Sequence, residues 1–290
     1  MRFFASIFIV MPIPLLFFSC SPLLNEADLP EEWQDVNYTY STQEEWCQKG
    51  NMRIYGELYL PDSVQNPLPL LVFSHGFGGS HTNGSNYARA MAQKGFAVYC
   101  FDFCGATKSS KSDGETTDMS IRTEEADLHA VVEHFKRDSR IDASHIYLAG
   151  ASQGGMVSAM MAADYPDDIR AMVLIYPAFV IPDDVHEWYP DRNNIDETFT
   201  LWGVKLGRIY VTDAYDYDVY AEIGHFTKPV LIIHGTDDNI VPVSYSQRAA
   251  EVYPDAELKI IEGAGHGFYG SDQTQATTWL TEFLLRQNNR

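Results

Sequence analysis

Residues 146–155 read IYLAGASQGG, and this stretch decides the fold of the chain. It begins as an apolar run typical of a buried strand and continues into small residues, 156–163, that favour a helix. The Gly-x-Ser-x-Gly pattern between these runs predicts a sharp strand-to-helix turn, because a side chain at either glycine would collide with the neighbouring backbone. Such a turn holds the hydroxyl of its serine at the carboxyl edge of a sheet. Ser152 is therefore the candidate nucleophile.

An acid and a base follow Ser152 further along the chain. They matter because the pattern around the serine is weak alone and arises by chance in roughly one chain in ten of this length. An apolar run ends in an acidic loop, where the spacing His-Gly-x-x-Asp-x-x-Val-Pro counted from His234 selects Asp238 rather than Asp237. His266 lies in a glycine-rich loop after another strand-like run. The chain order Ser, Asp, His is the one that accompanies this kind of turn in hydrolytic enzymes.

These residue types suit nucleophilic catalysis. A serine hydroxyl is a poor nucleophile near neutral pH until a base removes its proton, which is the role expected of His266. A carboxylate on the other ring nitrogen, here Asp238, fixes the tautomer and stabilises the imidazolium. The run 70–80 ends an apolar strand in a His-Gly-x-Gly-Gly loop. That loop predicts an oxyanion hole formed by the backbone N–H groups of Phe77 and Gln153.

From about Val36 to Leu285 the chain resembles the α/β-hydrolase superfamily and, more narrowly, is similar to bacterial feruloyl/cinnamoyl esterases and related serine acyl-ester hydrolases. The matching stretches are 74–79, 101–103, 150–155, 228–238 and 262–266. The resemblance implies a serine esterase that hydrolyses carboxylic esters through an acyl-enzyme on Ser152, with hydroxycinnamoyl (feruloyl-type) esters as candidate substrates. One stretch departs from the family, because Cys104-Gly105-Ala106-Thr107 stands where Arg or Asn followed by Gly-His-Gly is common.

Apolar strand-like runs alternate with helical segments along the chain. Strands are predicted near 52–60, 68–74, 96–102, 145–149, 171–176, 229–234 and 257–261, and helices near 82–94, 119–138, 153–164, 243–253 and 272–286. This alternation predicts the α/β class with an α/β-hydrolase fold: a mostly parallel sheet, helices on both faces and antiparallel pairing at the N-terminal edge. We expect a cap inserted after the sixth strand.

The expected cap is the segment 178–226, which is far longer than a connection between strands needs. It carries many aromatic residues beside acidic ones, so we expect it to cover the catalytic edge and to select an aryl or otherwise bulky ester. Tyr210 is the predicted substrate-binding residue, with Asp213, Asp216 and Asp218 as nearby hydrogen-bond acceptors. The alternative is an inert helical insertion whose aromatic residues only pack on the domain beneath.

The N-terminus is predicted to be separate from the hydrolase domain of residues 36–290. Residues 1–19 pair a short basic start with an apolar run, which is typical of a bacterial export signal. The run ends at Cys20, where a lipoprotein signal would attach lipid, and residues 20–35 then form a tether. We expect an envelope lipoprotein whose contact with a membrane is the lipid on Cys20. Simple secretion to the periplasm or medium and an uncleaved anchor are the alternatives.

The composition of the chain limits the kinds of partner that it is expected to bind. The chain has 40 Asp and Glu against 20 Lys and Arg, so binding to nucleic acid is not expected. No zinc motif is present, and we expect neither a metal nor a cofactor, only a small-molecule or polysaccharide-linked ester as substrate. With Cys20 lipidated, an odd number of cysteines remains, so no disulfide framework is implied, and pairing of Cys100 with Cys104 stays open. The competing functions are a serine peptidase of the prolyl-oligopeptidase type and a non-catalytic binding protein.

Overall fold

The computed structural model of the protein describes residues 36–65 and 67–288. The predicted export signal (1–19) and the whole of the predicted tether (20–35), which includes Cys20, lie outside the described residues, so they stay predictions. None of the helices in the described part of the chain is long and apolar enough to cross a membrane.

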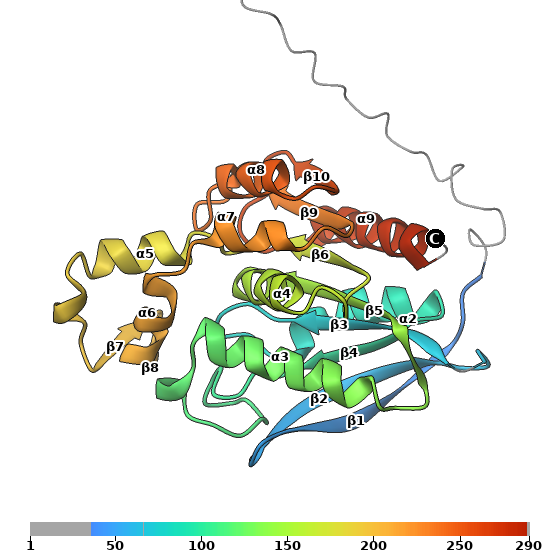
Figure 1. The fold of residues 1–290 in the computed structure, drawn as a ribbon. Helices are drawn as coiled ribbons and strands as arrows, with labels where there is room; N and C mark the ends of the chain where they lie inside the picture. The colour runs from blue at the N-terminus through green and yellow to red at the C-terminus, as the bar shows by residue number, and fades with distance from the viewer. Residues whose placement is uncertain (1–35, 66, 289–290) are drawn as a thin grey trace, which may run out of the picture.

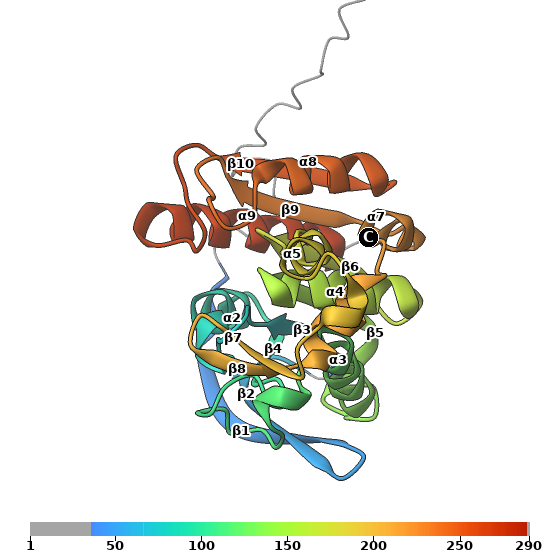
Figure 2. The same ribbon diagram turned by 90° about the vertical axis from the view of Figure 1, so that its left-hand side faces the viewer.

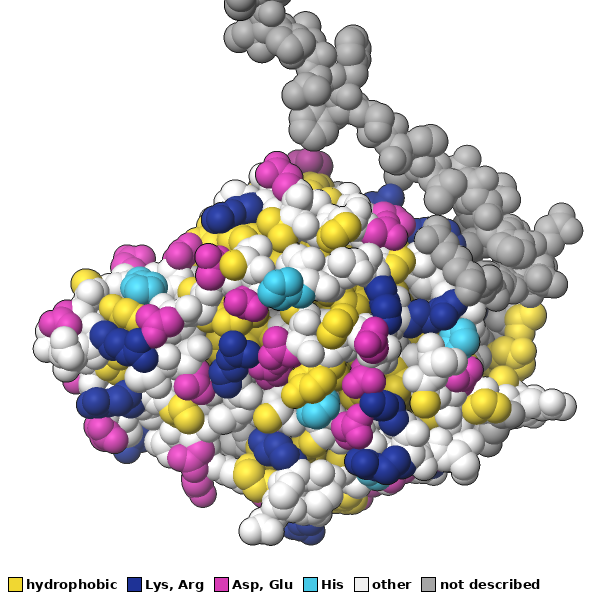
Figure 3. Space-filling model, in the orientation of Figure 1, with side chains coloured by type: hydrophobic (Ala, Val, Ile, Leu, Met, Phe, Trp, Pro, Cys, Tyr) yellow, Lys and Arg dark blue, Asp and Glu magenta, His cyan; other side chains and the backbone are white. Residues whose placement is uncertain are grey.

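Figure 3 shows acidic and basic side chains mixed over one face of the molecule.

An eight-stranded sheet forms the centre of the molecule, in the order β1-β2-β4-β3-β5-β6-β9-β10 (Figure 1). Its strands are β1 (Tyr40–Lys49), β2 (Met52–Pro61), β3 (Leu68–Ser74), β4 (Ala97–Phe101), β5 (Ile141–Ala151), β6 (Ala171–Ile175), β9 (Val230–Gly235) and β10 (Ala256–Ile261). β1 pairs antiparallel with β2, and β2 pairs antiparallel with β4, whereas every pair from β4 to β10 is parallel. The predicted mostly parallel sheet with an antiparallel N-terminal edge is confirmed, and β1 is an additional strand.

Helices cover both faces of the sheet, as predicted. Successive strand residues point to opposite faces, so Val72 packs in one hydrophobic cluster and its neighbour Phe73 in the other. α2 (Ser85–Gln93) and α9 (Gly270–Asn288) close the cluster that contains Phe73. α3 (Ile121–Phe135), α4 (Gln153–Asp164) and α8 (Val243–Val252) close the other. The central strands β4, β6 and β9 are buried and apolar on both faces because helices cover both sides of the sheet there, whereas the edge strand β1 is mostly exposed.

The predicted cap segment follows β6, the sixth strand of the chain, and projects at the left of Figure 1 and toward the viewer in Figure 2. It comprises α5 (Ile181–Trp188), a hairpin of β7 (Thr198–Leu201) and β8 (Val204–Gly207), α6 (Arg208–Tyr215) and α7 (Val219–Glu222). The hairpin lies tightly against the loop before α3, since a Cβ on Gly207 would lie 2.0 Å from the Thr117 carbonyl oxygen.

Candidate active site

The turn around Ser152 is the strained strand-to-helix connection that its sequence predicts. Ser152 lies between β5 and α4 with φ 54° and ψ −122°, a backbone conformation that L-residues seldom adopt. A Cβ on Gly150 would lie 2.2 Å from the Gly154 carbonyl oxygen, and one on Gly154 would lie 2.3 Å from the Ser74 carbonyl oxygen. Both glycines are therefore needed for β5 and α4 to pack, which raises the serine hydroxyl at the sheet edge.

A continuous chain of hydrogen bonds links Ser152, His266 and Asp238. His266 Nε2 lies 2.9 Å from Ser152 Oγ, and His266 Nδ1 lies 2.7 Å from Asp238 Oδ2. The histidine comes from the loop between β10 and α9, while the aspartate follows β9. Three residues that are far apart in the sequence thus meet in the order that proton transfer from a serine requires.

Asp238 is buried and held by several donors, whereas its neighbour Asp237 is exposed. Asp238 Oδ1 accepts hydrogen bonds from the backbone N–H groups of Ile240 and Val241, at 2.9 and 2.8 Å. Burial alone would raise the pKa of Asp238, but hydrogen bonds from His234, His266 and Val241 outweigh it and hold that pKa well below its usual range. Asp238 is therefore a carboxylate at neutral pH, able to fix the imidazole tautomer.

The loop of Phe77 passes directly over Ser152. A Cβ on Gly76 would lie 3.0 Å from the Ser152 Cβ, so loop and serine are in contact. Among the described residues, the backbone N–H groups of Phe77 and Gln153 have no hydrogen-bond partner. His75 has a structural role, since its ring Nδ1 contacts the Gly76 carbonyl oxygen at 2.8 Å and its Nε2 accepts from the Phe103 N–H at 3.2 Å.

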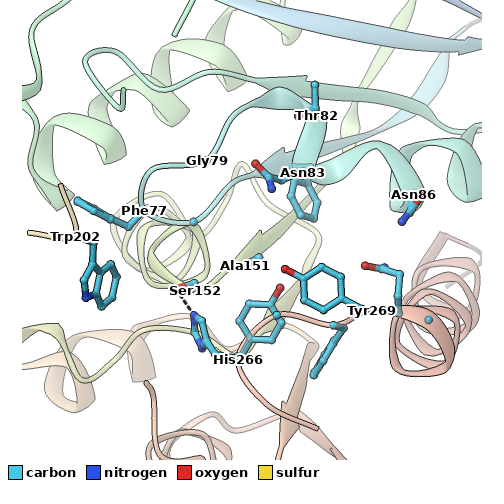
Figure 4. Close-up of a pocket in the computed structure, with 17 residues that line it drawn as sticks. Phe77, Gly79, Thr82, Asn83, Asn86, Ala151, Ser152, Trp202, His266 and Tyr269 are labelled. Carbon is cyan, nitrogen blue, oxygen red and sulfur yellow. Dashed lines mark hydrogen bonds between the residues drawn. The ribbon is translucent and has the colours of Figure 1, made fainter. Parts of the chain in front are cut away.

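A cavity of about 510 Å³ opens at Ser152 and His266. Figure 4 shows Phe77 and Trp202 on one side of the serine and Asn83, Asn86 and Tyr269 on the other. The full lining consists of Phe73, Gly76, Phe77, Gly79, Thr82, Asn83, Asn86, Ala151, Ser152, Tyr176, Trp202, His266, Gly267, Phe268, Tyr269, Gly270 and Gln273. The cavity therefore has an end beside the cap, lined by the aromatic rings of Phe77 and Trp202, which we call the aromatic end. The end beside α2 and α9, which we call the amide-rich end, combines the amides of Asn83, Asn86 and Gln273 with the Tyr269 ring.

Trp202 is the cap residue that lines this cavity, and sequence reasoning singled out Tyr210 instead. Trp202 and Gly203 form the two-residue turn of the β7–β8 hairpin, with φ of 47° and 85°. The indole is 69% exposed and lies edge-on to the Phe77 ring, with centroids 5.6 Å apart. This turn position has a left-handed backbone, which favours Asn, so a bulky residue there strains the backbone locally. Such strain is typical of functional positions.

Tyr210 is buried behind Phe77 and is absent from the cavity lining. Its hydroxyl donates to Gln153 Oε1 at 2.8 Å. The three predicted acidic acceptors also have other partners: Asp213 accepts from Ser120 Oγ, Asp216 pairs with Arg192, and Asp218 caps α7. A direct contact between Tyr210 and substrate stays a prediction. The sequence pair Trp202-Gly203, a bulky ring next to a turn glycine, is the signal that could have indicated the cavity residue.

Two other sets of reactive side chains lie away from the cavity lining. Cys47, Cys100 and Cys104 are buried free thiols, so Cys100 and Cys104 do not pair. His129, Glu133 and Asp168 bring donor atoms within 4.8 Å of one another. Lys136 Nζ contacts both carboxylates of that cluster, at 2.6 and 2.7 Å, and Arg137 Nη1 lies 3.6 Å from Glu133, so both carboxylates already have cationic partners.

Comparison with known proteins identifies the family. The protein-family model described as "Serine aminopeptidase, S33" matches residues 65–212, about half of the chain. A second family model, described as "TAP-like protein", matches residues 212–289. The human acylamino-acid-releasing enzyme is 24% identical over 198 residues, which cover 63% of this chain but only 25% of that protein. The putative carbamate hydrolase RutD of Caulobacter vibrioides is 24% identical over 252 residues, covering 74% of this chain and 90% of that protein.

A solved structure gives a further match. Est1E from Butyrivibrio proteoclasticus, with ferulic acid bound, has a TM-score of 0.79 and 28% identity, covering 85% of this chain and all of Est1E. The fold, the serine turn and these matches agree with one another. The chain belongs to the serine aminopeptidase S33 family of the α/β-hydrolase superfamily and is a serine hydrolase.

Proposed function

We propose that the chain is a serine esterase that hydrolyses carboxylic esters of aromatic acids through an acyl-enzyme on Ser152. The observation that carries the proposal is the hydrogen-bond chain Asp238–His266–Ser152 at the floor of an open cavity. Two N–H groups without partners among the described residues, those of Phe77 and Gln153, border the same serine. Nucleophile, base, orienting acid and oxyanion donors are the complete set for acyl transfer.

The reaction follows from this geometry in two halves. Ser152 Oγ attacks the ester carbonyl carbon while its proton passes to His266 Nε2, and the carbonyl oxygen becomes an oxyanion that accepts hydrogen bonds from Phe77 and Gln153. The C–O bond to the alcohol then breaks, and His266 returns the proton to the leaving oxygen. Water repeats the sequence on the acyl-enzyme and releases the acid. The ionised Asp238 stabilises the imidazolium in both halves.

The aromatic end of the cavity suits an aryl acyl group. Phe77 and Trp202 present ring faces and edges next to the serine, and such surfaces bind aromatic groups with little loss of side-chain freedom. The likeness to Est1E, whose structure holds ferulic acid, supports a hydroxycinnamoyl group at this end.

The amide-rich end suits a hydroxyl-bearing alcohol. His266 must reach the leaving oxygen, so the alcohol lies on the side where the chain continues from His266 to Tyr269. There Asn83, Asn86 and Gln273 offer donors and acceptors beside the exposed Tyr269 ring. Amides and an open ring face bind sugar hydroxyls and sugar faces, so we propose a sugar-linked ester as the natural form of the substrate.

A peptidase is the second candidate because the family model and the human relative carry peptidase names. An aminopeptidase needs an acidic group to pair with the ammonium of a free N-terminus. None of the described residues that line the cavity is Asp or Glu, which favours a neutral ester over such a peptide.

Parallel assays with p-nitrophenyl acetate, methyl ferulate and a panel of aminoacyl-p-nitroanilides test the proposal. We expect turnover of both esters and negligible cleavage of the anilides. Faster cleavage of an anilide than of any ester would make the chain a peptidase, and the absence of any turnover would favour a binding protein.

A further inference from the structure

The side chain of Gln153 is held at both of its polar atoms. Its Nε2 donates to Glu124 Oε2 at 2.8 Å, and its Oε1 accepts from the Tyr210 hydroxyl at 2.8 Å. Glu124, Gln153 and Tyr210 are only 2%, 1% and 3% exposed. We refer to these three residues as the buried relay. They come from α3, from the first residue of α4 and from α6 of the cap, so the relay crosses from the domain core into the cap.

Stability alone does not account for a carboxyl group at this place. Removing Glu124 from water is unfavourable, and no ion pair among the described residues includes it. Lys49, the cation that acts on Glu124 electrostatically, pairs with Asp127. A well-packed apolar side chain would fill such a site at lower cost. The one side chain that Glu124 hydrogen-bonds among the described residues is Gln153. Any role of Glu124 beyond stability therefore acts through Gln153.

Gln153 follows the nucleophile, and its backbone N–H is one of the two proposed oxyanion donors. An oxyanion donor acts only when it lies about 3 Å from the developing charge, so small displacements of the residue that carries it are costly. Tyr210 also packs edge-on against the Phe77 ring, with centroids 5.9 Å apart. One cap residue thus contacts both of the residues that carry the donors.

We propose that Glu124 and Tyr210 are positioning residues that hold the oxyanion hole in place, and that through Tyr210 the cap controls the rate of the chemical step. The inference rests on the proposed function, because it assumes that the N–H groups of Phe77 and Gln153 stabilise the oxyanion. It gives the cap a second role besides forming one end of the cavity.

The charge state of Glu124 adds a pH dependence to this role. Burial raises the pKa of Glu124 to about 8, the hydrogen bond from Gln153 lowers it, the neighbouring Asp127 raises it and Lys49 lowers it. The other titratable groups that α6 brings to this end of α3 are Tyr210 and Asp213. Glu124 is mostly neutral at pH 7, and its ionisation at higher pH places a negative charge behind the oxyanion, which opposes the transition state. Turnover should therefore fall as the pH rises through about 8.

Tyr210→Phe tests the link to the cap, because it removes one hydroxyl and keeps the ring. The matched control is Tyr215→Phe, a change in the same helix. It removes a hydroxyl that donates to the Tyr189 carbonyl oxygen at 2.9 Å. With enzyme concentration set by titration with a phosphonate inhibitor, we expect Tyr210→Phe to lower kcat about tenfold with KM changed less than about twofold, and Tyr215→Phe to leave both unchanged.

Glu124→Gln tests the carboxyl group, because the amide keeps an acceptor oxygen for Gln153 but cannot ionise. The control is Glu125→Gln, which changes the adjacent carboxyl group, bonded to Arg122. We expect the fall in kcat above pH 8 to disappear in Glu124→Gln and to persist in Glu125→Gln.

The proposed function and the positioning role of Glu124 and Tyr210 can be refuted separately. A wild-type protein that neither turns over esters nor forms a phosphonate adduct on Ser152 would refute the proposed function. An active wild-type protein in which Tyr210→Phe matches Tyr215→Phe and Glu124→Gln keeps the alkaline fall would refute the positioning role alone. A loss of thermal stability in these variants without a change in kcat or in its pH profile would assign the buried relay to folding.

Discussion

Replacing Trp202 by Asn should separate substrate selection from folding. Trp202 occupies the first position of a two-residue hairpin turn with positive φ, where Asn followed by Gly is a favoured pair. Trp202→Asn therefore suits the backbone better than the natural residue and should fold at least as well. What the variant loses is the indole at the aromatic end of the cavity.

The size of the loss follows from the contact that the indole offers. An aromatic acyl group stacked on Trp202 gains about 1 kcal/mol from the ring–ring interaction. Covering on the order of 40 Å² of apolar surface adds about 1 kcal/mol at about 25 cal/mol per Å². A total of about 2 kcal/mol corresponds to about a thirtyfold change in kcat/KM. An acetyl group is too small to reach the indole, so its hydrolysis should be little affected.

The assay is the ratio of kcat/KM for methyl ferulate to that for p-nitrophenyl acetate. We expect the ratio to fall ten- to thirtyfold in Trp202→Asn, as estimated from about 1.4 to 2 kcal/mol. Trp188→Asn is the matched control, because Trp188 belongs to the cap and packs near Phe199 but does not line the cavity. An unchanged ratio in Trp202→Asn, or an equal fall in Trp188→Asn, would refute the assignment of the acyl group to the Trp202 side.

Three further predictions concern the acid, the turn and the N-terminus. Asp238→Asn should lower kcat by about 10⁴-fold while Asp237→Asn changes it little, because only Asp238 contacts His266, and the reverse ranking would overturn the assignment. Gly154→Ala should abolish soluble expression, since its Cβ would lie 2.3 Å from the Ser74 carbonyl oxygen, whereas Gly155→Ala, with nearest atoms at 3.0 Å, should be milder in thermal melts. Cys20→Ser should release the protein from the membrane fraction if Cys20 carries lipid, and unchanged fractionation without an acylated N-terminus would remove that hypothesis.

The sequence predicted the parts of the molecule that depend on local backbone geometry. The Gly-x-Ser-x-Gly turn requires residues without side chains, so the strand, the strained turn at Ser152 and the helix after it could be located from residues 146–163 alone. The spacing counted from His234 pointed to Asp238 for the same reason, because a short loop after a buried strand leaves few positions for a carboxylate that reaches the histidine. In the structure this carboxylate lies 2.7 Å from His266 Nδ1.

Features that depend on tertiary packing could not be predicted in this way. The four-residue strands β7 and β8 are too short for a periodic pattern, so the hairpin that carries Trp202 was not foreseen. Tyrosine is a residue type that often binds ligands, yet α6 turns Tyr210 toward Gln153 and away from the cavity lining. Glu124 belongs to a helix with many charged residues, and its burial depends on the elements that pack on α3, which include β1, α4 and α6.

The most direct test of the account is the fate of Ser152 during turnover. Rapid mixing with p-nitrophenyl acetate should release a burst of one p-nitrophenolate per active site, and mass spectrometry of the quenched protein should find the acetyl group on the peptide that contains Ser152. Ser152→Ala should show neither the burst nor the adduct and should retain far less than about a tenth of the wild-type rate. An adduct on another residue, or a Ser152→Ala variant that keeps its turnover, would contradict the central claim that Ser152 is the nucleophile.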